Sequence, residues 1–144
     1  MIGIIDYKMG NLGSVLNACR FLGLEAEILA GPAAMSRCAG VILPGVGAFG
    51  DAMMHLRAAG YDTAVRAWMD ADRPLLGICL GMQVLFESSE EAPGVAGLGL
   101  VPGVVRKFVI PDPALKVPQM GWTAVQWTGV AGAFVESVPD ASYF

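Results

Sequence analysis

The chain has 144 residues and a mass of 15.0 kDa, a length that favours one domain over two independent cores. Hydrophobic residues make up 55% and charged residues 15%, which excludes intrinsic disorder and predicts that some apolar surface faces a partner. The net charge of −4, without a basic stripe, argues against nucleic-acid binding.

The three cysteines, Cys19, Cys38 and Cys79, are far apart, and no Cys-x-x-Cys pair occurs. An odd count with this spacing argues against a disulfide framework and against a zinc site, and it is typical of reduced thiols in a cytoplasmic protein. The first residues do not read as a signal peptide, and no apolar run is long enough to cross a bilayer. We expect no metal, no cofactor and no membrane association.

Strands and helices alternate along the first two thirds of the chain. Strands are expected at 1–5, 24–29, 40–43 and 74–78, and helices at 12–22, 51–59, 63–70 and from Cys79 through Glu87. Asn11 is placed to cap the first helix and Gly23 to end it. This alternation predicts an α/β fold with a mostly parallel sheet flanked by helices.

The amino-acid composition changes from Pro93 onward, where Pro and Gly become frequent. Strand-like pieces at 104–110 and 122–127 have no helix between them, which predicts an antiparallel or mixed C-terminal part packed on the same single domain, 1–144. The sequence stops at Phe144, within what reads as the start of another strand. We therefore expect a domain that is truncated at its C-terminus.

The strongest local signal is the pentapeptide G-I-C-L-G at 77–81, which follows an apolar strand and opens a helix. It has the layout of a nucleophile elbow with Cys79 in the place of the serine, and its glycines give room for a strained turn. A thiol at a helix N-terminus is favoured as thiolate, and the N–H of Leu80 would face a developing oxyanion. The alternative is a buried cysteine in a glycine-rich turn.

A second signal is the glycine loop at 44–50, where Gly45, Gly47 and Gly50 fit G-x-G-x-x-G. A dinucleotide site would pair it with Asp70 or Asp72, but the loop follows the third strand, and these acids precede a strand where a ribose-binding acid ends one. The other interpretations are the second half of an oxyanion hole opposite Cys79, or simply a tight turn.

A catalytic cysteine needs a base, and the chain has one histidine, His55. Its place in mid-helix, past the glycine loop, favours a structural or surface role, because catalytic groups gather at the carboxyl ends of the strands. Gln83 and Glu91 could each hold a polar substrate or be solvated. Trp122 could be a core residue or an anchor facing a partner.

Five segments together resemble a known family: IDYKMGNL (5–12), LPGVGAFGDAM (43–53), LLGICLGMQVLFESSEE (75–91), GLGLVPG (97–103) and KVPQMGW (116–122). They are similar to the glutaminase subunits of imidazole glycerol phosphate synthases, which are class I glutamine amidotransferases. The resemblance implies that glutamine is hydrolysed through a cysteinyl thioester. It also implies that the ammonia passes to a cyclase subunit, a (β/α)₈ barrel, which forms imidazole glycerol phosphate and AICAR in histidine biosynthesis.

The resemblance also implies roles for single residues. Cys79 would be the nucleophile. The oxyanion would be stabilised by backbone N–H groups of Gly45, Val46, Gly47 and Leu80. Gln83 and Glu91 would line the glutamine pocket. The barrel would meet the segment that holds Pro118, Met120, Gly121 and Trp122.

The sequence departs from the family at three places. Lys8 stands where a glycine is frequent, and Gln119 stands where a histidine is usual. The catalytic His and Glu of the family belong to a His-Pro-Glu motif that would lie beyond Phe144, so the chain as given is expected to be a poor glutaminase. The alternative function is a non-catalytic module that only docks the cyclase, and this would form the complex without turning over glutamine.

Overall fold

The computed structural model describes residues 1–111, 117, 121, 122 and 124. The chain divides into two compact units, Met1–Lys107 and Phe108–Phe144, and all helices and strands named below belong to the first.

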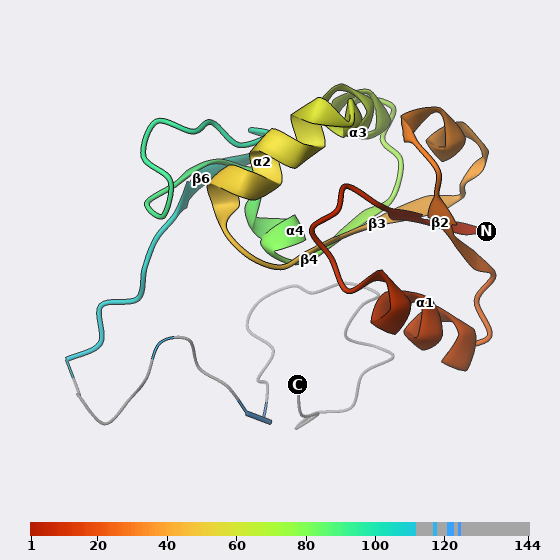
Figure 1. Ribbon diagram of the computed structural model, residues 1–144, viewed down its shortest axis with the longest axis horizontal. Coiled ribbons are helices and arrows are strands. Elements are labelled where there is room, and N and C mark those ends of the chain that lie inside the picture. Colours follow the sequence, from red (N-terminus) through yellow and green to blue (C-terminus); the bar gives the residue numbers. More distant parts are fainter. Residues whose placement is uncertain (112–116, 118–120, 123, 125–144) are drawn as a thin grey trace. The chain divides into compact units, whose positions relative to one another are not determined.

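A four-stranded parallel sheet forms the centre of the first unit (Figure 1). Its strands are β1 (Ile2–Ile5), β2 (Ala26–Leu29), β3 (Gly40–Gly45) and β4 (Leu75–Cys79), in the order β2-β1-β3-β4. The expected α/β fold with a parallel sheet is therefore confirmed. The strand β3 runs to Gly45, two residues beyond the expected end, because its ladder with β4 continues until Gly45 faces Cys79.

Helices cover both faces of this sheet. Figure 1 shows α1 (Leu12–Phe21) on one side, with α2 (Phe49–Ala58) and α3 (Tyr61–Asp70) on the other. The caps of α1 confirm the sequence pattern: the side-chain oxygen of Asn11 accepts the N–H of Ser14 at 3.2 Å, and Gly23 follows the helix end with φ 70°. After β2, Gly31 precedes a short 3₁₀ helix, η1 (Pro32–Arg37), which the sequence analysis did not predict.

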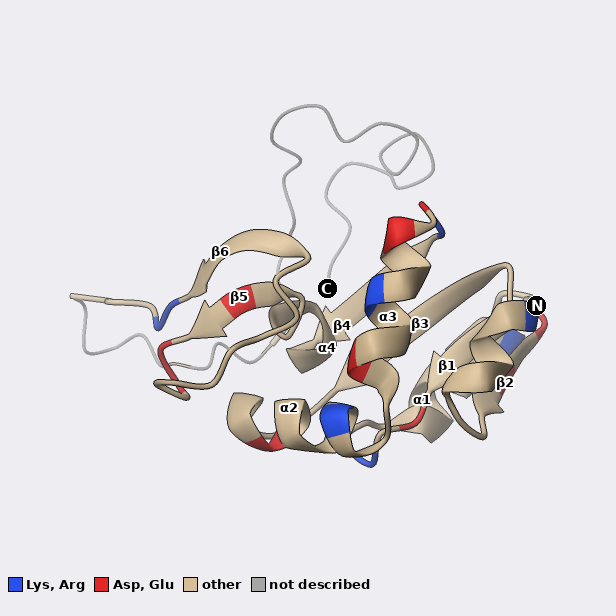
Figure 2. Cartoon of the chain, turned by 90° about the horizontal axis from the view of Figure 1, so that it is seen from above, with Lys and Arg blue, Asp and Glu red and all other residues tan. Residues whose placement is uncertain are grey.

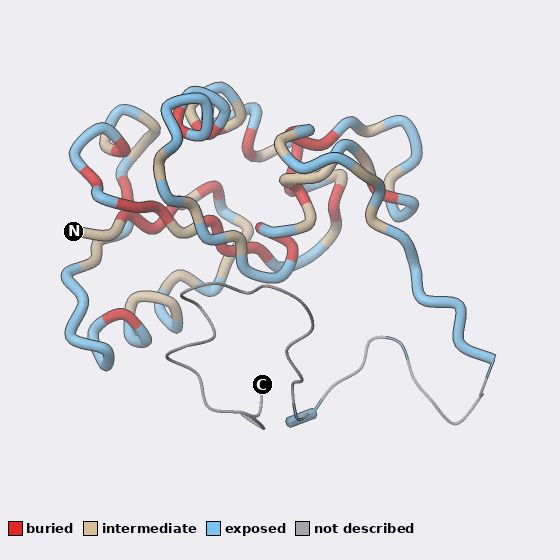
Figure 3. Tube along the Cα trace, turned by 180° about the vertical axis from the view of Figure 1, so that it is seen from behind, coloured by how far each residue is buried: buried red, intermediate tan, exposed pale blue. Residues whose placement is uncertain are grey.

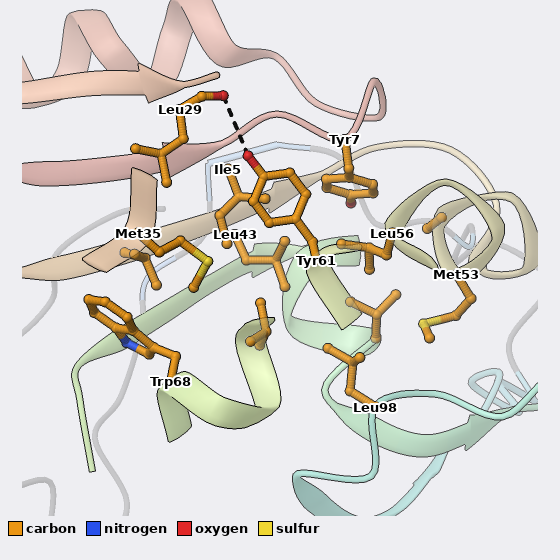
Figure 4. Close-up of a cluster of buried hydrophobic side chains, with 14 of the residues drawn as sticks. Ile5, Tyr7, Leu29, Met35, Leu43, Met53, Leu56, Tyr61, Trp68 and Leu98 are labelled. Carbon is orange, nitrogen blue, oxygen red and sulfur yellow. Dashed lines mark hydrogen bonds between the residues drawn. The ribbon is translucent and has the colours of Figure 1, made fainter. Parts of the chain in front are cut away.

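The core lies between the sheet and the pair α2 and α3 (Figure 4). Figure 3 shows that the strands carry long buried stretches, and the side chains of Ile5, Leu43, Leu56 and Val65 have no exposed surface. Burying each such side chain contributes about 1.5–3 kcal/mol, so the strands and helices hold one another in place.

The expected helix from Cys79 through Glu87 is wrong. The helix α4 (Leu80–Gln83) is a single turn, and the strand β5 (Phe86–Ser89) follows it. The cause is a distant segment: Leu98 and Leu100 donate their N–H groups to the carbonyls of Val84 and Leu85, each at 2.8 Å. These carbonyls are therefore not available for continuing a helix.

The expected antiparallel or mixed arrangement after Pro93 is mixed within the described residues. The strand β6 (Val101–Val105) pairs with β5 in parallel, and within the described residues the antiparallel element is one bridge, between Ser88 and Ala96. The chain between β5 and β6 crosses back to the starting end of β5, as a parallel pair requires. Arg57 of α2 donates a hydrogen bond to the carbonyl of Ala96 at 2.6 Å and fixes this crossing.

Two further strands were expected, at 104–110 and 122–127. The strand β6 ends at Val105, so most of the first piece is not strand. Most of the second piece lies outside the described residues.

Candidate active site

Cys79 lies at the sharp turn between β4 and α4, with its side chain exposed. Its backbone has φ 54° and ψ −118°, a region that side-chain-bearing residues rarely adopt. The expected strained turn is thus confirmed. Strain of this kind is stored at functional sites, because the surrounding structure must hold the residue there.

The glycines on both sides of Cys79 are required by close packing. A Cβ on Gly77 would lie 2.6 Å from the Cα of Met82, and one on Gly81 would overlap the carbonyl oxygen of Leu43. The turn therefore needs glycine before and after the cysteine, which explains the G-I-C-L-G pattern physically.

The helix that was expected to favour a Cys79 thiolate is too short for that effect. A thiolate favoured by a helix macrodipole needs a helix of several turns, whereas α4 has four residues. The N–H of Leu80 still belongs to the first turn of α4, where backbone donors have no partner within the helix.

The glycine loop lies directly beside this turn. Gly45 is the ladder partner of Cys79, and a Cβ at Gly45 would lie 2.5 Å from the nitrogen of Gly81 and 2.9 Å from the Cβ of Leu80. Two strands that end side by side bring the loop and the cysteine together, as the oxyanion-hole interpretation requires.

Within this loop the N–H of Val46 is already engaged. It donates to the carbonyl of Met9 at 2.9 Å, so in this arrangement it does not face a substrate oxygen. Gly47 has φ 98°, which favours glycine, and it is exposed. Gly45, Gly47 and Leu80 remain predicted donors.

Glu91 has a structural partner that local sequence signals did not reveal. Its carboxylate accepts the N–H of Phe49, the first residue of α2, at 3.2 Å, across 42 positions of sequence. Glu91 therefore caps α2 and ties the loop after β5 to the loop after β3. Gln83 lies half-buried at the end of α4, on the same short turn as Leu80.

Tyr7 is a site residue that the sequence analysis missed, because its position after β1 reads as a turn. Its side chain is buried, and its hydroxyl has no hydrogen-bond partner within the described residues. A Cβ on Gly45 would lie 2.6 Å from the hydroxyl oxygen. Burial, followed by the nearby Cys79 thiolate, raises the pKa of Tyr7 to about 12, so the phenol stays protonated.

Three other candidates from the sequence, His55, Asp70 and Asp72, do not belong to the turn that holds Cys79. His55 is half-buried in α2, and none of the hydrogen bonds among the described residues joins its ring to Cys79. Asp70 ends α3 and Asp72 lies in the turn before β4, so both acids precede a strand, unlike a ribose-binding acid.

The segment assigned to the partner lies mostly outside the described residues, which include neither Pro118 nor Met120 nor Gln119. Gly121 has φ 145°, and the side chain of Trp122 is 84% exposed. The contact of Trp122 with a partner stays a prediction.

Two features are absent from the described part of the chain. No cluster of three His, Cys, Asp or Glu side chains is placed to hold a metal ion there. Nor does any helix in that part have the length and apolar character needed to cross a membrane. Figure 2 shows the charged residues scattered over helices, loops and the strand β5.

Comparison with known proteins gives one consistent picture. Residues 4–128 match the family described as glutamine amidotransferase class-I. The chain is 47% identical over 143 residues to the imidazole glycerol phosphate synthase subunit HisH of Moorella thermoacetica, covering 99% of this chain and 66% of that protein. It is 45% identical to the subunit of the same name from Chlorobaculum tepidum, covering all of this chain and 70% of that protein.

A solved structure supports the same fold. A crystal structure of a glutamine amidotransferase superposes with a TM-score of 0.65 at 21% identity, over 78% of this chain and 59% of that one. The chain spans about two thirds of the length of the curated relatives it matches.

Proposed function

Because the chain belongs to the class I glutamine amidotransferase family, we propose that it is the glutaminase part of an imidazole glycerol phosphate synthase. The observation that carries this proposal is the exposed Cys79 at a strained turn, φ 54°, directly opposite the glycine loop that ends β3. A merely structural cysteine has no need of that conformation or of exposure.

The chemistry would proceed from the sulfur of Cys79. The thiolate attacks the side-chain amide carbon of glutamine, and the oxygen gains negative charge as the tetrahedral intermediate forms. The N–H groups of Leu80 and Gly47 are the donors we assign to that oxygen. The nitrogen leaves as ammonia after it receives a proton, and water then hydrolyses the thioester to release glutamate.

The proton transfers need a base, and His55 is the one histidine of this sequence. We do not assign it this role, because its helix α2 is not part of the turn that holds Cys79. The resemblance implies that the base is a histidine paired with a glutamate, in a segment that corresponds to sequence after Phe144.

Glutamine itself would be held by Gln83 and Glu91. The carboxylate of Glu91 uses one oxygen, Oε2, to accept the N–H of Phe49. Its second oxygen can then accept a hydrogen bond from the substrate's ammonium group, so the same side chain would link substrate binding to the position of α2.

The ammonia would pass to a cyclase (β/α)₈ barrel in a heterodimer. We assign the contact to the segment with Pro118, Met120, Gly121 and Trp122, and the exposed side chain of Trp122 fits such an anchor. Free thiols at Cys19, Cys38 and Cys79 fit a cytoplasmic location.

The test is glutamine hydrolysis by this chain when a C-terminal segment carrying the histidine and glutamate of the family is supplied, with and without the cyclase. Glutamate release should depend on Cys79, and Cys79→Ala should lower it on the order of 10⁴-fold. If the complex forms but glutamine is never hydrolysed, the non-catalytic docking module is the better account.

A further inference from the structure

The buried hydroxyl of Tyr7 is a polar group with no described partner in an otherwise well-paired interior. The side chain of Tyr7 is 1% exposed, and its hydroxyl is the one buried side-chain polar atom of the described residues that lacks a hydrogen bond. A buried O–H without an acceptor is unfavourable, so each such group needs an explanation.

The second buried tyrosine gives an internal comparison. Tyr61 is also 1% exposed, yet its hydroxyl donates to the carbonyl of Leu29 at 3.4 Å, as Figure 4 shows. Both tyrosines belong to the same core cluster. One of the two buried tyrosine hydroxyls is therefore hydrogen-bonded within the core, whereas the Tyr7 hydroxyl has no partner among the described residues.

The place of the Tyr7 hydroxyl points to the Cys79 turn. The position that a Cβ on Gly45 would occupy is 2.6 Å from this oxygen and 2.5 Å from the nitrogen of Gly81. Gly45 in turn pairs with Cys79. The hydroxyl thus lies beside Gly45, the residue that pairs with the proposed nucleophile at the point where β3 and β4 end and α4 begins.

We propose that Tyr7 is a positioning residue whose O–H donates a hydrogen bond to the sulfur of Cys79 when that sulfur is a thiolate. The proposal rests on the proposed function, since it concerns the nucleophile of that reaction. A rotation of the exposed Cys79 side chain toward the core would form the bond, and the donor would then stabilise the negative charge. Because the phenol stays protonated, Tyr7 acts as a donor and never as a base.

The other titratable groups around the turn belong to neighbouring elements. The elements packed against α4 are β3, β4, α2 and β5, and their remaining titratable side chains are Asp51, His55 and Arg57 of α2 and Glu87 of β5. Asp6 lies next to Tyr7 in sequence, but it forms its ion pair with Lys8. Of the described charges, only that of Cys79 raises the pKa of Tyr7, so the two groups lie within electrostatic reach of each other.

The experiment is the pH dependence of Cys79 alkylation by iodoacetamide in the full chain, read residue by residue by peptide mass mapping. Cys19 and Cys38 are buried and serve as internal references. Tyr7→Phe should raise the pH midpoint of Cys79 alkylation by about one unit, equal to a tenfold slower reaction at a pH below the midpoint. Tyr61→Phe, which removes the paired phenol, should leave the midpoint unchanged.

Stability provides the second measurement. Tyr7→Phe keeps the ring and removes an unpaired hydroxyl, so its melting temperature should equal or exceed that of the parent chain. Tyr61→Phe loses a hydrogen bond and should melt lower. If Tyr7→Phe still folds and its pH midpoint of Cys79 alkylation equals that of the parent chain, the proposal is wrong.

The two proposals can fail separately. If Tyr7→Phe raises the pH midpoint of Cys79 alkylation but no form hydrolyses glutamine, the Tyr7 contact is supported and the proposed glutaminase function is wrong. Hydrolysis that depends on Cys79, with no shift in Tyr7→Phe, would overturn the Tyr7 contact alone.

Discussion

Gly45 and Cys79 face each other as the last ladder pair of β3 and β4. This one pairing places the glycine loop, the strained cysteine and the buried Tyr7 in a single neighbourhood. It follows from the parallel register of two adjacent strands, because their carboxyl ends lie at the same edge of the sheet.

The closeness of this pair predicts that Gly45 tolerates no side chain. A Cβ there would lie 2.5 Å from the nitrogen of Gly81, so Gly45→Ala should lower the free energy of unfolding by about 1–3 kcal/mol. Gly13→Ala is the control, since a Cβ at Gly13 meets nothing within 4 Å and α1 gains a better helix former. Urea denaturation of both variants distinguishes them. Equal stabilities would contradict the packing described around Gly45.

Lys8 is predicted to carry backbone strain. It has φ 71°, in the left-handed region where a glycine is favoured, and the resembling family often has glycine there. Lys8→Gly should therefore raise the free energy of unfolding by about 0.5–1 kcal/mol despite the loss of an exposed ion pair with Asp6. Lys8→Ala loses the same ion pair and keeps the strain, so it should not stabilise. A gain in Lys8→Ala equal to that in Lys8→Gly would mean that φ is not the cause.

Asp6 predicts a pH dependence of stability at the acidic end. The N–H of Lys8 donates to its carboxylate at 2.9 Å and, as the largest cause, holds the pKa of Asp6 below its ordinary value of 3.8. The folded state therefore binds this proton less readily than the unfolded state. The stabilisation is complete above pH 3.8 and is lost as the pH falls through the lowered value.

The measurement compares the parent chain with Asp6→Asn by thermal unfolding between about pH 6 and pH 3. The difference in melting temperature between the two should be largest at the upper end and shrink toward the lower end. A difference that grows on acidification would show that the sign of the Asp6 effect is wrong.

Glu91 should matter for stability as well as for the proposed binding of glutamine. Its carboxylate caps α2 at Phe49, so Glu91→Ala should cost about 0.5–1 kcal/mol in the free energy of unfolding. Glu91→Gln keeps an acceptor oxygen and should retain most of this stability. Glutamine binding should weaken in both variants, because both remove the negative charge that would face the ammonium group of the substrate. Calorimetric titration with glutamine and urea denaturation separate the two effects.

The strands of the parallel sheet and the turn at Cys79 could be predicted from the sequence. Apolar runs and helical spacing indicated the positions of β1 to β4 along the chain but not their order in the sheet. The pattern G-I-C-L-G indicated the strained turn at Cys79, because glycines on both sides are a local requirement. The resemblance read from five segments is confirmed by the family match over residues 4–128.

What the sequence missed depends on contacts between distant residues. The apolar stretch after Gln83 fits a helix and a strand equally well, and the choice is made by the N–H groups of Leu98 and Leu100. The bond from Phe49 to Glu91 joins positions 42 apart, and the burial of Tyr7 depends on Gly45. None of these contacts leaves a local pattern in the chain.

The most direct test of the account is labelling of Cys79 by a glutamine analogue that carries a diazoketone in place of the amide. We expect the label on Cys79 alone, competition by glutamine, and no label on the buried Cys19 and Cys38 or in Cys79→Ala. Labelling that glutamine does not reduce, or that persists in Cys79→Ala, would contradict the assignment of Cys79 as a glutamine-directed nucleophile.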